Sequence, residues 1–121
     1  MTVLPSVLLL SFTVAIGLFM GQRRLRGVPN TPVMIGVHFL LGAAVLEVLA
    51  AGLHSTPGGI SAGGGFGSWT LLFAGLALFS GIVGALMRQQ ASPARRSLLA
   101  VHAAVAVTAL ALALVLFAKL A

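Results

Sequence analysis

The sequence predicts an all-α polytopic membrane protein: a single domain of four transmembrane helices in an up-down bundle, with the N and C termini outside. Three observations support this fold class. Of the 121 residues, 60% are hydrophobic and only 7% are charged, whereas roughly a quarter are charged in an ordinary soluble domain. Four apolar segments are each close to the ~20 residues with which a helix crosses a bilayer. Six of the seven positive charges fall in two connections between these segments.

The four spans are expected near residues 3–20, 33–53, 68–87 and 98–120. None of them alternates apolar and polar residues as a barrel strand does, and in lipid a helix satisfies its own backbone polar groups. The first span has no basic stretch before it and no obvious small-residue cleavage site after it. We therefore interpret it as a retained span and not as a signal peptide.

The connections predict how the chain is oriented in the membrane. The first, GQRRLRGVPNTP, and the third, RQQASPARRS, are basic, whereas the middle one, STPGGISAGGGFG, has no charge. Basic loops face the cytoplasm, so the Gly-rich connection and both termini are expected outside. We expect an integral protein of the bacterial inner (plasma) membrane, and the net charge of +6 indicates orientation and not a nucleic-acid partner. The Gly-rich connection lacks GK[ST], which favours a flexible turn over phosphate binding.

The two halves of the chain resemble each other. Each half has an apolar span that ends in LFM or ALM, then a basic loop with proline, then a span that carries one histidine, His38 or His102. This order predicts a parallel duplication, in which a pseudo-twofold axis runs along the membrane normal.

His38 and His102 are the strongest candidates for a cofactor site. Both are expected roughly 8–12 Å inside the cytoplasmic ends of their helices, at 1.5 Å of rise per residue. The second and fourth spans run in the same direction and stand diagonally in an up-down bundle. The chain has no cysteine, which excludes disulfides, iron–sulfur clusters and thiolate zinc sites. Two imidazoles at matched depth suit the axial ligands of one haem b per chain.

Other residues fit the same haem. Gly42 and Ala106 lie one turn beyond the two histidines, where small side chains keep the ligand face flat. Haem propionates that point toward the cytoplasm would form charge-assisted pairs with arginines of the basic connections. These candidates are Arg23, Arg24, Arg26, Arg95 and Arg96. Two interpretations stay open beside haem: a magnesium-chlorin pigment on each histidine, or histidines that only bond a neighbouring carbonyl or serine.

With His38, His102, the basic loops and the bundle size, the chain resembles the transmembrane b-type cytochromes, the haem-b subunits of membrane redox enzymes. The resemblance covers the architecture of the whole chain and includes no long motif. Many members hold two haems with four histidines, whereas this chain has three histidines, so one haem is expected. The resemblance implies electron transfer between a quinol or quinone and a protein partner.

Glu47 and His54 lie on the other face of the second span. Glu47, the only acidic residue of the chain, is nine positions beyond His38 and therefore half a turn away around the helix. It is expected to be protonated in lipid. Three roles stay open: a bond to a carbonyl or to Thr13, a proton relay from a quinone site with His54 at the outer mouth, or a contact in a homo-oligomer or larger membrane complex.

Two other functions remain alternatives to the cytochrome. Small multidrug-type transporters are four-helix proteins with one membrane glutamate, and LGAAVLEVLA is similar to their glutamate helix, although theirs is the first span and this is the second. A proton-coupled transporter would use Glu47. The chain could instead be a non-catalytic accessory subunit of a larger complex. Whether it is an enzyme is left open.

Overall fold

The computed structural model describes residues 3–87 and 92–121, and Arg88 of the third connection lies outside the described residues. Four α-helices make up nearly all of the described chain, which contains no strand: α1 (Leu4–Leu25), α2 (Pro32–His54), α3 (Phe66–Leu86) and α4 (Pro93–Leu120). A short 3-10 helix, η1 (Gly59–Ser61), lies in the Gly-rich connection. Each α-helix is long and apolar enough to cross a membrane. The all-α class is thus confirmed, and so are four helices with the length and apolarity of membrane spans.

Proline and a hydroxyl cap begin both histidine-bearing helices. Pro32 and Pro93 each occupy the first helical turn, where the missing N–H costs no hydrogen bond. The Thr31 side chain accepts a hydrogen bond from the backbone N–H of Met34 at 3.3 Å, and the Ser92 side chain accepts one from that of Arg95 at 3.4 Å. These caps explain why α4 begins at Pro93, five residues before the expected span.

The arginines accordingly lie closer to the helices than we expected. Arg23 and Arg24 occupy the last turn of α1, and Arg95 and Arg96 the first turn of α4, while Arg26 caps α1. Hydropathy marks only the apolar part of each helix, whereas capping sets where the helix ends. The basic connections are therefore shorter than predicted, and four of their arginines, Arg23, Arg24, Arg95 and Arg96, are held on helical backbone.

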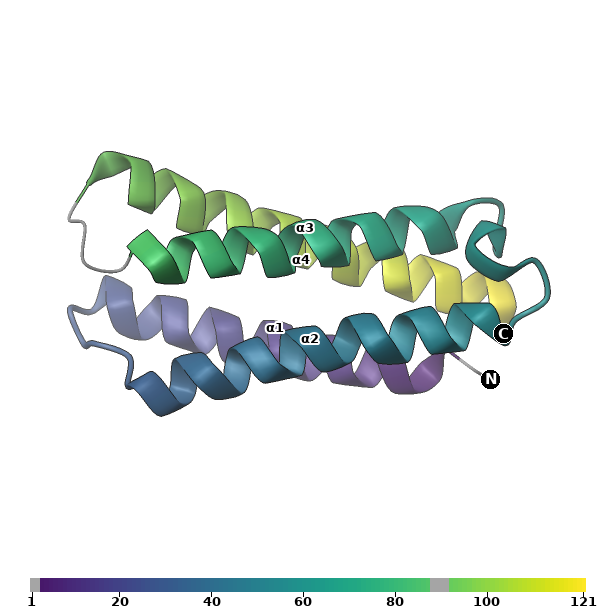
Figure 1. Cartoon of the computed structure of the whole chain (residues 1–121), viewed down its shortest axis with the longest axis horizontal. Coiled ribbons are helices and arrows are strands. Elements are labelled where there is room, and N and C mark those ends of the chain that lie inside the picture. Colours follow the sequence, from purple (N-terminus) through teal and green to yellow (C-terminus); the bar gives the residue numbers. More distant parts are fainter. Residues whose placement is uncertain (1–2, 88–91) are drawn as a thin grey trace.

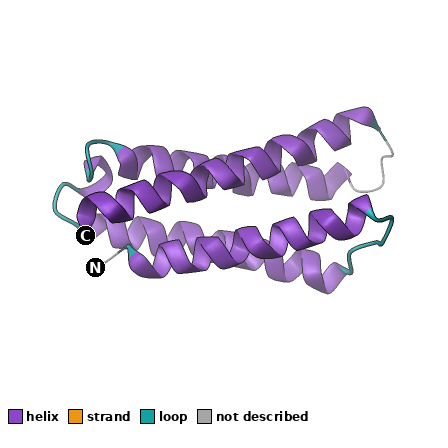
Figure 2. Cartoon of the chain, turned by 180° about the vertical axis from the view of Figure 1, so that it is seen from behind, coloured by secondary structure: helices purple, strands orange, loops and turns teal. Residues whose placement is uncertain are grey.

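The helices form an up-down bundle (Figure 1; Figure 2). Extensive contacts join α1 to α2, α2 to α3, α3 to α4 and α1 to α4, so that α2 and α4 stand diagonally, with α3 against α4 the largest interface. Both termini lie at the same end of the bundle as η1, and the connection between α1 and α2 lies at the other end (Figure 1). We call these the η1 end and the basic end.

The buried apolar core lies in the η1 half of the bundle. Leu49, Leu53 and Leu116 are at most 1% exposed. The buried apolar residues of the described chain are Val3, Val7, Leu10, Val14, Val45, Leu49, Leu53, Ala62, Ala74, Ala109, Ala113 and Leu116. They come from the η1 half of their helices or from the Gly-rich connection, except Val3, which lies just before α1 at the same end. Large apolar side chains such as Leu40 and Phe79, 66% and 65% exposed, cover the outside, as suits a surface in lipid.

The burial pattern repeats at an offset of 64 positions. His38 and His102 are related by this offset, and so are the buried pairs Val45 and Ala109, and Leu49 and Ala113. The same offset relates two buried hydroxyl residues whose side chains donate to backbone carbonyls one turn earlier, Ser6 in α1 and Thr70 in α3. Matched burial and matched hydrogen bonding support the parallel duplication that the sequence order predicted.

Candidate functional site

The structure brings His38 and His102 together between the diagonal helices α2 and α4. Their ring centroids are 6.0 Å apart and the ring planes are at 84°. Both side chains are half-buried. His38 lies six residues into α2 and His102 nine residues into α4, which corresponds to roughly 9 and 13 Å of helix. The two imidazoles nevertheless meet at one level, because α4 begins further out than α2.

A glycine of the preceding helix lies against each imidazole. A Cβ atom on Gly17 of α1 would be 2.9 Å from Cε1 of His38, and one on Gly81 of α3 would be 3.0 Å from Cε1 of His102. Real Cβ contacts are essentially never as short as the distance at Gly17, and the distance at Gly81 is shorter than nine in ten of them. Gly17 and Gly81 are also 64 positions apart. Each half of the chain therefore supplies one histidine and one glycine that makes room for it.

The hydrogen bonding of the two imidazoles differs. Nδ1 of His102 is 2.9 Å from the carbonyl oxygen of Ala77 and 3.1 Å from Oγ of Ser80. Since a carbonyl oxygen only accepts, a hydrogen bond at this distance requires the proton on Nδ1 of His102, and Nε2 then has a free lone pair. Nδ1 of His38 has no hydrogen-bond partner among the described residues. The ring nevertheless lies near the carbonyl of Thr13, the residue 64 positions before Ala77.

The histidine pair lies where the buried core ends. In the described residues from the pair to the basic end, no apolar side chain is buried. The side chains that face inward there are thus less deeply buried than those of the η1 half.

Of the predicted flanking residues, Gly42 and Ala106 lie on the η1 side of the pair. A Cβ on Gly42 would be 3.4 Å from Cδ1 of Leu78, so Gly42 faces α3. Ala106 is half-buried and packs against the core. Both small residues therefore set how closely their helices approach at the inner boundary of the site.

Arginines from both halves meet at the basic end. The positive charges of Arg24 and Arg95 are close enough to repel each other, and Nε of Arg23 and of Arg95 is shielded without a hydrogen-bond partner among the described residues. Arg23 donates through Nη2 to the carbonyl of Pro29 at 3.1 Å. Arg26 and Arg96 are exposed. An anion bound at this end would relieve the repulsion between the arginines. It would also lie near the N-terminus of α4, where negative charge is favoured.

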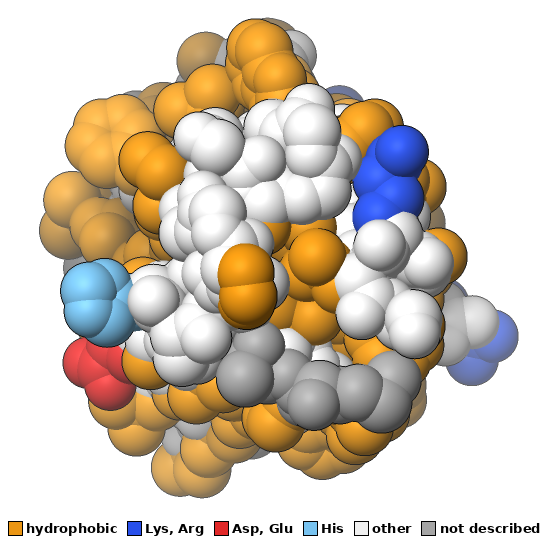
Figure 3. Space-filling model, turned by 90° about the vertical axis from the view of Figure 1, so that its right-hand side faces the viewer, with side chains coloured by type: hydrophobic (Ala, Val, Ile, Leu, Met, Phe, Trp, Pro, Cys, Tyr) orange, Lys and Arg blue, Asp and Glu red, His pale blue; other side chains and the backbone are white. Residues whose placement is uncertain are grey.

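Glu47 and His54 lie away from the histidine pair, on the outside of α2, and both are exposed. Figure 3 shows acidic and histidine side chains next to each other at the edge of the η1 end, surrounded by apolar ones. Thr13, one expected partner of Glu47, is buried and donates to the carbonyl of Leu9 at 2.8 Å. The Glu47 carboxyl thus points toward whatever surrounds the bundle.

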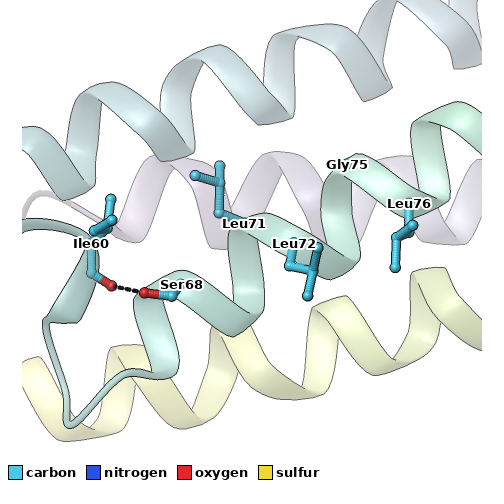
Figure 4. A pocket seen from close by; sticks show the side chains of 6 residues that line it. All are labelled: Ile60, Ser68, Leu71, Leu72, Gly75 and Leu76. Atoms are coloured by element: carbon cyan, nitrogen blue, oxygen red, sulfur yellow. Dashed lines mark hydrogen bonds between the residues drawn. The ribbon is translucent and has the colours of Figure 1, made fainter.

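An open apolar groove of about 440 Å³ runs along α3 near η1, lined by Ile60, Ser68, Leu71, Leu72, Gly75 and Leu76 (Figure 4). Its polar side chain, Ser68, donates to the carbonyl of Ile60 at 2.7 Å. The groove therefore presents a hydrocarbon surface, and it contains none of the titratable residues of the chain.

Sequence reasoning found the histidines and missed their neighbours. From the sequence alone Gly17, Gly81 and Ser80 carry no signal of a site, because small residues are common where membrane helices meet. The 64-residue offset between the histidines is the signal that would have found the glycines, since it relates Gly17 to Gly81. No family model, curated protein or solved structure matches the chain.

Proposed function

We propose that this protein is a membrane b-type cytochrome that carries electrons through one haem b per chain, held by His38 and His102. The observation that carries the proposal is the approach of the two imidazoles at 6.0 Å between ring centroids. A haem iron would take one nitrogen of each imidazole as ligands, and the two rings that could supply them approach each other from diagonal helices.

A porphyrin accounts for the donor set better than a bare metal ion does. The described residues contain no group of three or more His, Cys, Asp or Glu side chains that could hold a metal. A porphyrin would supply most of the iron's ligands itself, so the two residues His38 and His102 would be enough to hold it. When bound, haem supplies one-electron chemistry between its ferric and ferrous states.

Residues of the protein would make space for the two ligand imidazoles, orient them and neutralise the haem propionates. Gly17 and Gly81 leave room for the ligand imidazoles, and the Ala77 carbonyl orients His102. Arg24 and Arg95 would pair with the two propionates, which offsets the cost of placing these groups at the edge of the bilayer. With the basic end toward the cytoplasm, the electron partner is expected to be a quinol or quinone and a neighbouring redox protein, in a quinone-linked complex of the bacterial inner membrane.

The proposal is tested by the amount and spin state of haem in purified protein. We expect one non-covalent haem b per chain after expression with ample haem, and a low-spin ferric electron paramagnetic resonance signal of two imidazole ligands. A haem content near zero, or a high-spin signal, would contradict two histidine ligands.

A second candidate is an accessory subunit of a larger membrane complex, with or without haem. The observation that favours it is the exposed Glu47 on an otherwise apolar surface. A carboxyl group is costly in lipid, and a partner helix with a hydrogen-bond donor would remove that cost. The same exposure means that proton-coupled transport through Glu47 would need a path between this chain and a second one, and not a path inside the bundle.

A further inference from the structure

The two histidines are related by the internal duplication, yet one neighbouring position breaks the symmetry. Ser80 of α3 is almost completely buried, at 9% exposure. Its Oγ donates to the carbonyl of Ala77 at 3.0 Å and lies 3.1 Å from Nδ1 of His102. The position 64 residues earlier is Ile16, whose side chain can form no hydrogen bond. His102 thus has a polar partner that His38 lacks.

Three groups close a small ring of hydrogen bonds around Nδ1 of His102. The Ala77 carbonyl accepts from Nδ1, and it also accepts from the Ser80 hydroxyl. A lone pair of Ser80 Oγ remains free to share the Nδ1 proton. The imidazole is therefore held in one tautomer and one orientation, with Nε2 directed away from α3. Nδ1 of His38 makes no hydrogen bond within the described residues. The Thr13 carbonyl lies near its ring, but no hydroxyl of the described chain stands beside it to share the proton, so His38 is held by fewer contacts than His102.

We propose that Ser80 is a positioning residue for His102, and that it makes His102 the more firmly oriented and more electron-rich of the two ligands. A hydrogen bond from the outer ring nitrogen of a ligating histidine fixes its tautomer and increases its basicity. The inference rests on the proposed haem function for its redox consequence. Its structural part, the tautomer of His102, concerns the chain alone.

The structural part is tested in the full-length protein without haem, in nanodiscs, by ¹⁵N NMR of labelled histidine. We expect the ring of His102 to be protonated at Nδ1, and Ser80→Ala to weaken this preference while His38 stays unchanged. Ser80→Thr keeps the hydroxyl and should retain the wild-type signal. An Nδ1 of His102 that carries no proton, or one that Ser80→Ala leaves unchanged, would overturn the role of Ser80.

The redox part is tested by potentiometric titration of the haem-loaded variants. An electron-rich ligand stabilises ferric iron, so Ser80→Ala should raise the midpoint potential. Ile16→Ser places a hydroxyl at the matched position beside His38 and should lower the potential. A side chain that only packs would not shift the potential in opposite directions at two related sites. Shifts of the same sign, or no shift, would overturn the inference.

The experiments distinguish a failure of the proposed haem function from a failure of the proposed role of Ser80. A wild-type protein that binds no haem overturns the proposed function and, with it, the redox consequence of Ser80. The tautomer measurement is independent of haem and still decides whether Ser80 orients His102.

Discussion

Gly17 and Gly81 provide a matched pair of perturbations of the candidate site. A Cβ added at Gly17 would be 2.9 Å from Cε1 of His38, and ordinary contact begins at 3.4 Å. The imidazole, or α1, must therefore move by about 0.5 Å in Gly17→Ala, and the corresponding shift for Gly81→Ala is about 0.4 Å. Functional groups need placement within ~0.5 Å. Overpacking of this kind costs about 1–3 kcal/mol of folding free energy. Where the apo chain relieves that strain by moving the imidazole and haem binding restores it, the affinity for haem falls by up to roughly 150-fold.

The assay is titration of haem into the purified apo protein, followed by absorbance in the Soret region. Gly21→Ala in α1 and Gly75→Ala in α3 are the controls, because a Cβ at either position meets nothing within 4 Å. Alanine in place of a helical glycine favours the helix by about 1 kcal/mol, so the controls should fold at least as well as wild type. If Gly17→Ala and Gly81→Ala bind haem as tightly as their controls do, the histidines are not ligands in this arrangement.

Three further predictions follow from the same geometry. His38→Ala and His102→Ala should each abolish haem retention on purification, while His54→Ala, at the exposed η1 end, should retain it; haem retained in both ligand variants would refute the assignment. Arg95→Gln should weaken haem binding by no more than about fivefold, or about 1 kcal/mol, because solvent at the basic end screens the pair of Arg95 and a haem propionate. High salt should abolish the difference in affinity between this variant and wild type. Glu47→Gln should leave the haem spectrum unchanged, and native mass spectrometry of gently solubilised wild type should show an assembly larger than one chain, which a clean monomer would contradict.

The spans could be predicted from the sequence because lipid requires only that each helix be long enough and apolar enough to cross it. The helix ends could not, because they depend on caps. Ser92 and Pro93 start α4 well before its apolar stretch begins, and no hydropathy window detects a cap. The same limit placed Arg95 and Arg96 in a loop, whereas both lie in the first turn of α4.

The histidines could be predicted as a pair because helix rise converts matched spacing into matched depth. Their neighbours required the packing of α1 on α2 and of α3 on α4. A glycine in an apolar helix is equally compatible with tight packing and with space for an imidazole, and only the contact of Gly17 with His38 distinguishes the two. The difference between Ser80 and Ile16 likewise indicates a difference between the two histidines only when the structure places Ser80 beside His102.

The central claim, one haem b between His38 and His102, is tested most directly by the visible spectrum of the purified protein, oxidised and then reduced with dithionite. The account predicts a sharp α-band and a shifted Soret band on reduction, as low-spin haem with two histidine ligands gives. A protein that carries no chromophore despite expression with ample haem would contradict it, and would leave Glu47 and the accessory-subunit function as the better explanation of this bundle.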